Sequence, residues 1–195
     1  MLNNHYIKES AKGFDTLGVA ETLLSQRRIF LTEPVTETSC HVLIQQLMFL
    51  ESESQTDEIT MYINSPGGLL HDGLAVYDAM RMLKAPLRTV CIGTAASMGS
   101  ILFLGADKRE MLPHTRIMIH DPFYGSGNFS GMKPHELQQQ VDELNKVREQ
   151  TGLIIAERTG HTLEEIYEKT CKDSFFSAEE AIKFGLATGI ADGLV

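Results

Sequence analysis

Ser97 stands in a stretch of small residues where a serine hydroxyl could act as a nucleophile. Residues 93–100 read Gly-Thr-Ala-Ala-Ser-Met-Gly-Ser and lie between apolar runs at 87–92 and 101–104. Small neighbours let a substrate backbone approach closely, and a helix that begins beside the serine presents free N–H groups and a positive dipole end. The same pattern is typical of a serine that caps a buried helix. The stretch therefore leaves a nucleophile and a helix cap open.

His120 is the candidate base for this serine. A serine hydroxyl is a weak nucleophile until a base removes its proton, and histidine is the commonest such base. The chain has seven histidines, and His120 alone closes a predicted core strand beside a glycine-rich loop. Active sites of α/β proteins gather at such strand ends. A histidine that is merely hydrogen-bonded at the end of a strand is the alternative.

Asp173 is the candidate carboxylate that would orient the histidine and stabilise its charged form. It follows a predicted helix and precedes an apolar Phe-Phe pair, so we expect it to be partly buried. Asp121 is adjacent to His120, but successive side chains of a strand point in opposite directions. The alternative for Asp173 is an ordinary residue at a helix end.

Two backbone amides are candidates for an oxyanion hole. The Met98 N–H lies one residue past the serine and can point at a developing negative charge. Gly68 ends a second glycine turn, residues 64–68 (Asn-Ser-Pro-Gly-Gly), which also joins a predicted strand to a predicted helix. The turn can equally be a plain strand-to-helix connection.

The elements that must position these groups alternate between strands and helices. Apolar periodicity and turn residues predict strands at 28–31, 59–63, 87–92 and 115–119, and helices at 36–50, 70–83, 101–104, 137–158, 162–170 and 177–185. In the helix predicted at 36–50, we expect the buried face to be formed by Val42, Leu43, Leu47 and Leu50. Helical connections predict an α/β fold with a largely parallel sheet.

Two segments outside the predicted strands and helices have a less regular sequence pattern. Residues 1–22 are polar and weakly patterned, so we expect an amino-terminal arm, followed by a single domain at 23–195. Residues 123–132 are expected to form a loop, either a flexible flap or an edge ribbon. The long helix that follows has an apolar stripe and is expected either to project toward a partner or to lie on the surface.

Composition narrows the class of protein. The chain has 195 residues, a net charge of −9 and three widely spaced cysteines. The acidic charge argues against nucleic acid as the main partner. No apolar run approaches the roughly 20 residues of a membrane span, and residues 1–9 lack the apolar core of a signal peptide. The cysteines form no disulfide framework. We therefore expect a cytoplasmic location and no membrane association.

Four motifs resemble the ClpP family, the serine peptidases that form the proteolytic subunit of the Clp protease. They stand in the family's order and spacing at residues 62–68, 95–99, 116–120 and 172–181. The first is similar to the family's glycine turn and the second to its nucleophile motif. The third is similar to its histidine strand and the fourth to the segment that holds its third catalytic member.

The resemblance implies a crotonase-like fold of stacked ββα units with a projecting handle, at roughly residues 122–158. It implies two stacked heptamers around a chamber, fed with unfolded chains by an AAA+ unfoldase that uses ATP. By resemblance, Ser97 is the nucleophile, His120 the base and Asp173 the orienting group. It implies no metal and no cofactor in this subunit.

Further site residues follow from the same resemblance. The Gly68 and Met98 amides would form the oxyanion hole, and Tyr62 and Met82 would line the hydrophobic pocket between subunits that receives the unfoldase. The chain departs from the family at 171–172, where Cys-Lys replaces an acidic residue and an arginine. The arm and the loop at 123–134 also differ. Such departures are typical of a secondary paralogue that works in a mixed ring.

Three functions remain open from sequence. The leading hypothesis is a serine endopeptidase that cuts unfolded chains through an acyl-enzyme. The second is a ring-forming structural subunit with little activity of its own. The third is a crotonase-type acyl-CoA enzyme, since that fold also pairs two oxyanion amides.

Overall fold

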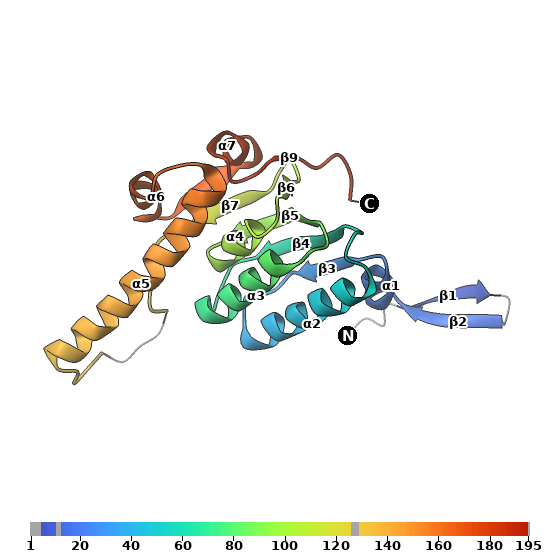
Figure 1. The fold of residues 1–195 in the computed structure, drawn as a ribbon, viewed down its shortest axis with the longest axis horizontal. Helices are drawn as coiled ribbons and strands as arrows, with labels where there is room; N and C mark the ends of the chain where they lie inside the picture. Colours follow the sequence, from blue (N-terminus) through green and yellow to red (C-terminus); the bar gives the residue numbers. More distant parts are fainter. Residues whose placement is uncertain (1–4, 11–12, 126–128, 195) are drawn as a thin grey trace.

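The computed structural model describes residues 5–10, 13–125 and 129–194 and shows a mixed α/β fold (Figure 1). In chain order the elements are β1 (His5–Ser10), β2 (Gly13–Gly18), α1 (Val19–Ser25), β3 (Arg28–Leu31), α2 (Glu37–Glu53), β4 (Ile59–Ser65), α3 (Leu70–Met82), β5 (Leu87–Ala96), α4 (Met98–Phe103), β6 (Lys108–Met111), β7 (Arg116–Ile119), α5 (Pro134–Thr159), α6 (Leu163–Thr170), β8 (Ser174–Ser177), α7 (Ala178–Phe184) and β9 (Gly189–Ile190). The predicted α/β class is confirmed.

A seven-stranded sheet forms the centre of the molecule. The strands β3, β4, β5, β6 and β9 lie in this order, and each neighbouring pair is parallel. The strand β7 is parallel to β5, and β8 pairs with β7 in the antiparallel direction. The prediction of a largely parallel sheet is therefore confirmed, with β8 as the antiparallel strand.

The strand β5 has two successive partners along one edge. Its residues 88–91 pair with β6, and its residues 94–96 pair with β7. It runs to Ala96, four residues beyond the predicted end at Ile92, because residues 94–96 pair with β7 and Ala95 also pairs with Ser65 of β4. The end of β5 consequently lies between β4 and β7.

The helices α2 and α3 lie side by side over the sheet (Figure 1) and share its main hydrophobic core. Leu43, Leu47 and Leu50 of α2 are buried, as predicted. The inclusion of Val42 in this face was wrong, because its side chain is 43% exposed. A spacing of four and three residues keeps the three leucines on one side of the helix, and Val42 precedes that side by about 100° of rotation.

The strand β6 was not predicted, because its sequence, Lys-Arg-Glu-Met, has no apolar alternation. Hydrogen bonds and an ion pair with other elements stabilise its charged side chains. Glu110 is paired with Arg88 of β5, whose Nε donates at 2.7 Å. The buried guanidinium of Arg109 donates to backbone carbonyls at the ends of α5 and α7, including Arg158 O at 3.2 Å and Gly185 O at 3.1 Å. Tertiary contacts thus specify this strand.

The amino-terminal segment forms a two-stranded antiparallel hairpin, β1–β2, at one end of the molecule (Figure 1). These strands lie within the predicted arm, of which residues 1–4 and 11–12 lie outside the described residues. The predicted boundary at residue 22 falls inside α1, which begins at Val19 directly after the hairpin.

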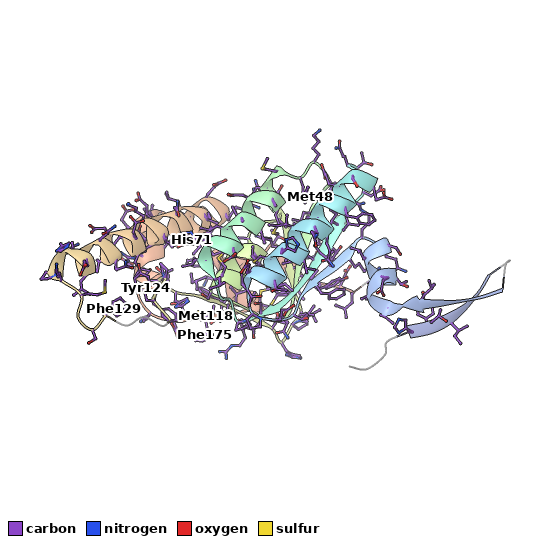
Figure 2. All side chains as sticks on the ribbon, turned by 90° about the horizontal axis from the view of Figure 1, so that it is seen from below. Met48, His71, Met118, Tyr124, Phe129 and Phe175 are labelled. Atoms are coloured by element: carbon purple, nitrogen blue, oxygen red, sulfur yellow. The ribbon has the colours of Figure 1, made fainter. Side chains whose placement is uncertain are left out.

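The helix α5 projects from the opposite end of the molecule (Figure 1). Its predicted apolar stripe is half-exposed in its first turns, where Leu137 is 37% and Val141 49% accessible. Tyr124 and Phe129, from the segment before the helix, contact each other edge to face at 5.8 Å (Figure 2). Residues 126–128 of this predicted loop lie outside the described residues. No helix in the described part of the chain combines the length and apolarity needed to cross a membrane.

Candidate active site

Ser97 occupies a strained turn between β5 and α4. Its φ of 54° and ψ of −125° lie in a region that non-glycine residues rarely adopt, and such strain concentrates at functional sites. Two contacts hold the turn: the Ser97 amide donates to Met118 O on β7 at 2.9 Å, and the Ser100 hydroxyl donates to Ser97 O at 2.6 Å. The Ser97 side chain makes no capping bond to α4. The helix-cap alternative is therefore not supported.

His120 lies directly beside this serine. Its Nε2 is 2.8 Å from Ser97 Oγ, and its side chain is 11% exposed. The pairing of β5 with β7 explains the contact, because Ala96 lies opposite Met118, one residue before the serine and two before the histidine. The Phe123 ring packs edge-on against the imidazole at 5.4 Å between centroids. The structure thus brings the candidate nucleophile and the candidate base into contact.

Asp173 completes the set from the antiparallel strand. Ile119 pairs with Ser174, so the residue before β8 lies across from the residue after β7. The Asp173 Oδ1 is 3.6 Å from His120 Nδ1, which is longer than a hydrogen bond. The expected partial burial of Asp173 was wrong, because its side chain is 63% exposed and the loop that carries it lies at the surface.

The glycine turn at 66–68 packs against the start of α4. Gly67 has a φ of +91°, and a Cβ there would lie 2.6 Å from Ser97 Cβ and 2.8 Å from the Met98 amide nitrogen. Met98 is the first residue of α4, where a backbone N–H has no partner within the helix. Gly68 lines the same cleft as Ser97. Sequence analysis missed Gly67 as the residue of closest approach, because adjacent glycines give no signal of which one makes the contact.

A backbone bridge to Val35 holds this glycine turn in place. Gly68 has a φ of +152° and forms an isolated parallel bridge with Val35. Val35 donates to Gly67 O at 2.9 Å and accepts from the Leu69 amide at 2.8 Å. These bonds fix the backbone on both sides of Gly68 without involving its own N–H.

A cleft of about 860 Å³ surrounds the three side chains. His120 and Asp173 are the titratable groups among the described residues that line it. The walls are otherwise mainly apolar and come from several elements, including Leu70, Ile101, Met118, Phe123 and Ile155. Met118 is set opposite Phe175 across the β7–β8 pair (Figure 2). The cleft is therefore suited to uncharged groups.

The cysteines lie outside this arrangement. Burial raises the pKa of the Cys91 and Cys40 thiols above the ordinary value, because the interior disfavours a thiolate. Neither residue lines the cleft, so Ser97 has no thiol competitor there. Within the described residues, no group of three or more His, Cys, Asp or Glu side chains is arranged to hold a metal ion.

The two residues expected to contact a partner, Tyr62 and Met82, differ in exposure. The Tyr62 ring is 3% exposed and stacks on Phe30 at 5.0 Å, and its hydroxyl donates to Leu194 O near the carboxyl end. Met82 is 82% exposed at the end of α3. Neither residue lines the cleft that holds Ser97.

Similarity to known proteins extends over almost the whole chain. A family model described as Clp protease matches residues 11–193. This match defines the class of the protein as a serine peptidase, a hydrolase. The chain belongs to the Clp protease family, and its activity is that of a ClpP-type peptidase.

Proposed function

We propose that this chain is a serine endopeptidase that cuts unfolded polypeptides to short peptides through an acyl-enzyme. The observation that supports it best is the 2.8 Å contact between His120 Nε2 and the hydroxyl of a strained serine in an open cleft. A strained backbone at the nucleophile is typical of hydrolases that expose a serine between a strand and a helix. This arrangement favours a peptidase over an acyl-CoA enzyme, which needs no serine–histidine pair.

In the proposed mechanism, Ser97 Oγ attacks the substrate carbonyl carbon while His120 Nε2 takes the hydroxyl proton. The imidazolium then gives this proton to the leaving amine, and the C–N bond breaks to leave an ester on Ser97. Water, activated by the same histidine, hydrolyses the ester. Asp173 favours the tautomer with the proton on Nδ1 and stabilises the positive charge, and the Gly68 and Met98 amides bind the oxyanion.

A fluorophosphonate probe tests this function on the purified chain without any added subunit. We expect one covalent adduct, and peptide mass spectrometry should locate it on Ser97, because only an activated serine attacks the probe. Prior denaturation is the control and should abolish the adduct. An adduct on another residue, or none in the folded chain, contradicts the proposal for this chain alone.

A second candidate, a structural ring subunit with little activity of its own, is favoured by one observation. Asp173 is exposed and stands 3.6 Å from His120, so this chain by itself does not close the hydrogen bond that orients the base. The Cys171–Lys172 segment beside it lacks the arginine fork expected of the family. Labelling that appears only after a paralogue is added would support this candidate.

The apolar cleft predicts which peptides are cut. A leucine before the scissile bond should give a kcat/KM at least about tenfold higher than a lysine or glutamate there, because an apolar wall cannot compensate a desolvated charge. Fluorogenic peptides of equal length measure the ratio, and a set with the charge moved to the far end serves as the control. Equal rates for leucine and lysine peptides would contradict the assignment of the cleft.

The assembly and the finer fold are also proposals. We propose a crotonase-like arrangement of repeated strand–helix units, supported by the succession β3–α2, β4–α3 and β5–α4. We also propose that the chain assembles into two stacked heptamers, made either of this chain alone or of this chain and a paralogue. The exposed apolar side chains of the projecting α5 support this proposal. The enclosed chamber would restrict Ser97 to chains that an ATP-driven AAA+ unfoldase threads into it.

Docking of the unfoldase is proposed at Tyr62 and Met82. Since the carboxyl-terminal segment around Leu194 binds the Tyr62 hydroxyl, docking at this tyrosine requires that segment to move. The cytoplasmic location, the absence of a cofactor or metal in this subunit, and the absence of nucleic-acid and membrane partners stay predictions from the sequence.

A further inference from the structure

Asp121, the residue after His120, uses both oxygens of its carboxylate. Its Oδ1 accepts from the Thr170 hydroxyl at 2.5 Å, and its Oδ2 is 2.8 Å from Arg148 Nε on α5. Its backbone amide also donates to Thr170 O at 2.7 Å. We call the two hydrogen bonds between Asp121 and Thr170 the Asp121–Thr170 clasp. The Asp121 side chain accepts one of them, and the Asp121 backbone amide donates the other.

The clasp joins the two segments that carry the base and its orienting carboxylate. His120 immediately precedes Asp121, and Asp173 follows Thr170 by three residues. Thr170 is buried at the end of α6, with 4% of its surface exposed. A further hydrogen bond, from the Ser174 hydroxyl to Lys169 O at 2.7 Å, spans residues 170–173, the loop that carries Asp173. The loop is therefore anchored at both ends.

Asp173 has little else to place it. Its side chain is 63% exposed, and its contact with His120 spans 3.6 Å. An exposed side chain is held mainly by the backbone that bears it, so a shift of the loop moves the carboxylate directly. A displacement of about 1 Å at a reacting group can cost about 10²-fold in rate.

Arg148 is the ion-pair partner of Asp121, whose side chain is 29% exposed. The Arg148 guanidinium lies over the Tyr167 ring at 3.9 Å from the centroid, which fixes it beside Asp121. The Asp121 carboxylate thus accepts a hydrogen bond from the Thr170 hydroxyl and carries the charge that pairs with Arg148.

We propose that Asp121 and Thr170 are positioning residues, whose clasp sets the distance between His120 and Asp173. This inference rests on the proposed peptidase function. It assigns no contact with substrate to either residue. Its prediction is that loss of the clasp lowers turnover while substrate binding in the cleft is retained.

Thr170→Val tests the clasp, because it removes the hydroxyl and nearly preserves the volume. In the assembled fraction from size exclusion, we expect kcat to fall about 10–100-fold while KM stays within about twofold. Thr170→Ser keeps the hydroxyl and should restore kcat to within about threefold of the wild type. Asp121→Ala, which removes the acceptor of the Thr170 hydroxyl, should lower kcat in the same way.

Thr89→Val is the matched control, since Thr89 is also buried and its hydroxyl donates to Phe103 O at 2.8 Å, in the first half of β5. It should lower stability and leave kcat within about twofold. Wild-type kcat in both Thr170→Val and Asp121→Ala, or equal losses in Thr170→Val and Thr170→Ser, would overturn the clasp. Failure of the wild-type protein to label at Ser97 would instead overturn the peptidase function.

Discussion

Replacing Ser97 with alanine is expected to lower peptide cleavage by at least about 10³-fold and to abolish fluorophosphonate labelling. The reason is that the attacking oxygen is lost while the cleft, the histidine and the glycine turn remain. Alanine also tolerates a positive φ no better than serine, so the turn keeps its strain. Initial rates on a fluorogenic peptide and gel detection of the probe give the two readouts.

Ser52→Ala is the control for this experiment. Ser52 lies near the end of α2, and its exposed hydroxyl donates to Phe49 O at 2.7 Å, as an ordinary helical serine does. Its replacement should leave both readouts unchanged. Cleavage by the Ser97 variant at more than about a tenth of the wild-type rate, with assembly preserved, would refute Ser97 as the nucleophile.

Gly67→Ala should have the second largest effect, on activity and on stability together. A Cβ at this position would stand 2.6 Å from Ala96 O and from Ser97 Cβ, closer than unbonded atoms approach. The left-handed backbone adds a cost of about 1–2 kcal/mol for any side chain, and overpacking adds about 1–3 kcal/mol. We expect the free energy of unfolding to fall by about 2–5 kcal/mol. The turn beside Ser97 must also shift, so kcat/KM should drop about 10²-fold.

Gly160→Ala separates backbone strain from the close approach. Gly160 has a φ of +81° at the carboxyl end of α5, and a Cβ there would meet no atom within 4 Å. It should cost only the conformational term, about 1–2 kcal/mol, and leave kcat/KM within about twofold. Urea unfolding and peptide kinetics of the two variants provide the comparison. Equal effects of the two substitutions would contradict a specific contact between Gly67 and the serine turn.

The sequence predicted those parts of the fold in which local pattern and tertiary packing agree. The helices α2 and α3 follow apolar spacing, and α7 ends at Gly185 in the left-handed conformation expected of a helix terminus. The strand β6 could not be predicted, because its charged residues are held by Arg88 and by carbonyls from distant helices. The same holds for the extension of β5, which depends on pairing with β7, a strand later in the chain.

The candidate site was predictable by residue type and less so by geometry. Small residues around Ser97, a histidine at a strand end and an aspartate after a helix pointed to the three side chains that the structure brings together. The strain at Ser97 and the exposure of Asp173 had no local signal, because both depend on the pairing of β7 with β5 and β8. The Asp121–Thr170 contact was hidden for the same reason, since its partners are separated by 49 residues.

The position of β8 has a consequence for how this protein would lose activity on warming. It is a four-residue strand at the margin of the sheet, and its strand partner is β7. Peripheral segments open at a free energy below that of global unfolding. Detachment of β8 would carry Asp173 away while β3, β4 and β5 keep their pairing. Inactivation would then precede melting, and it would reverse on cooling.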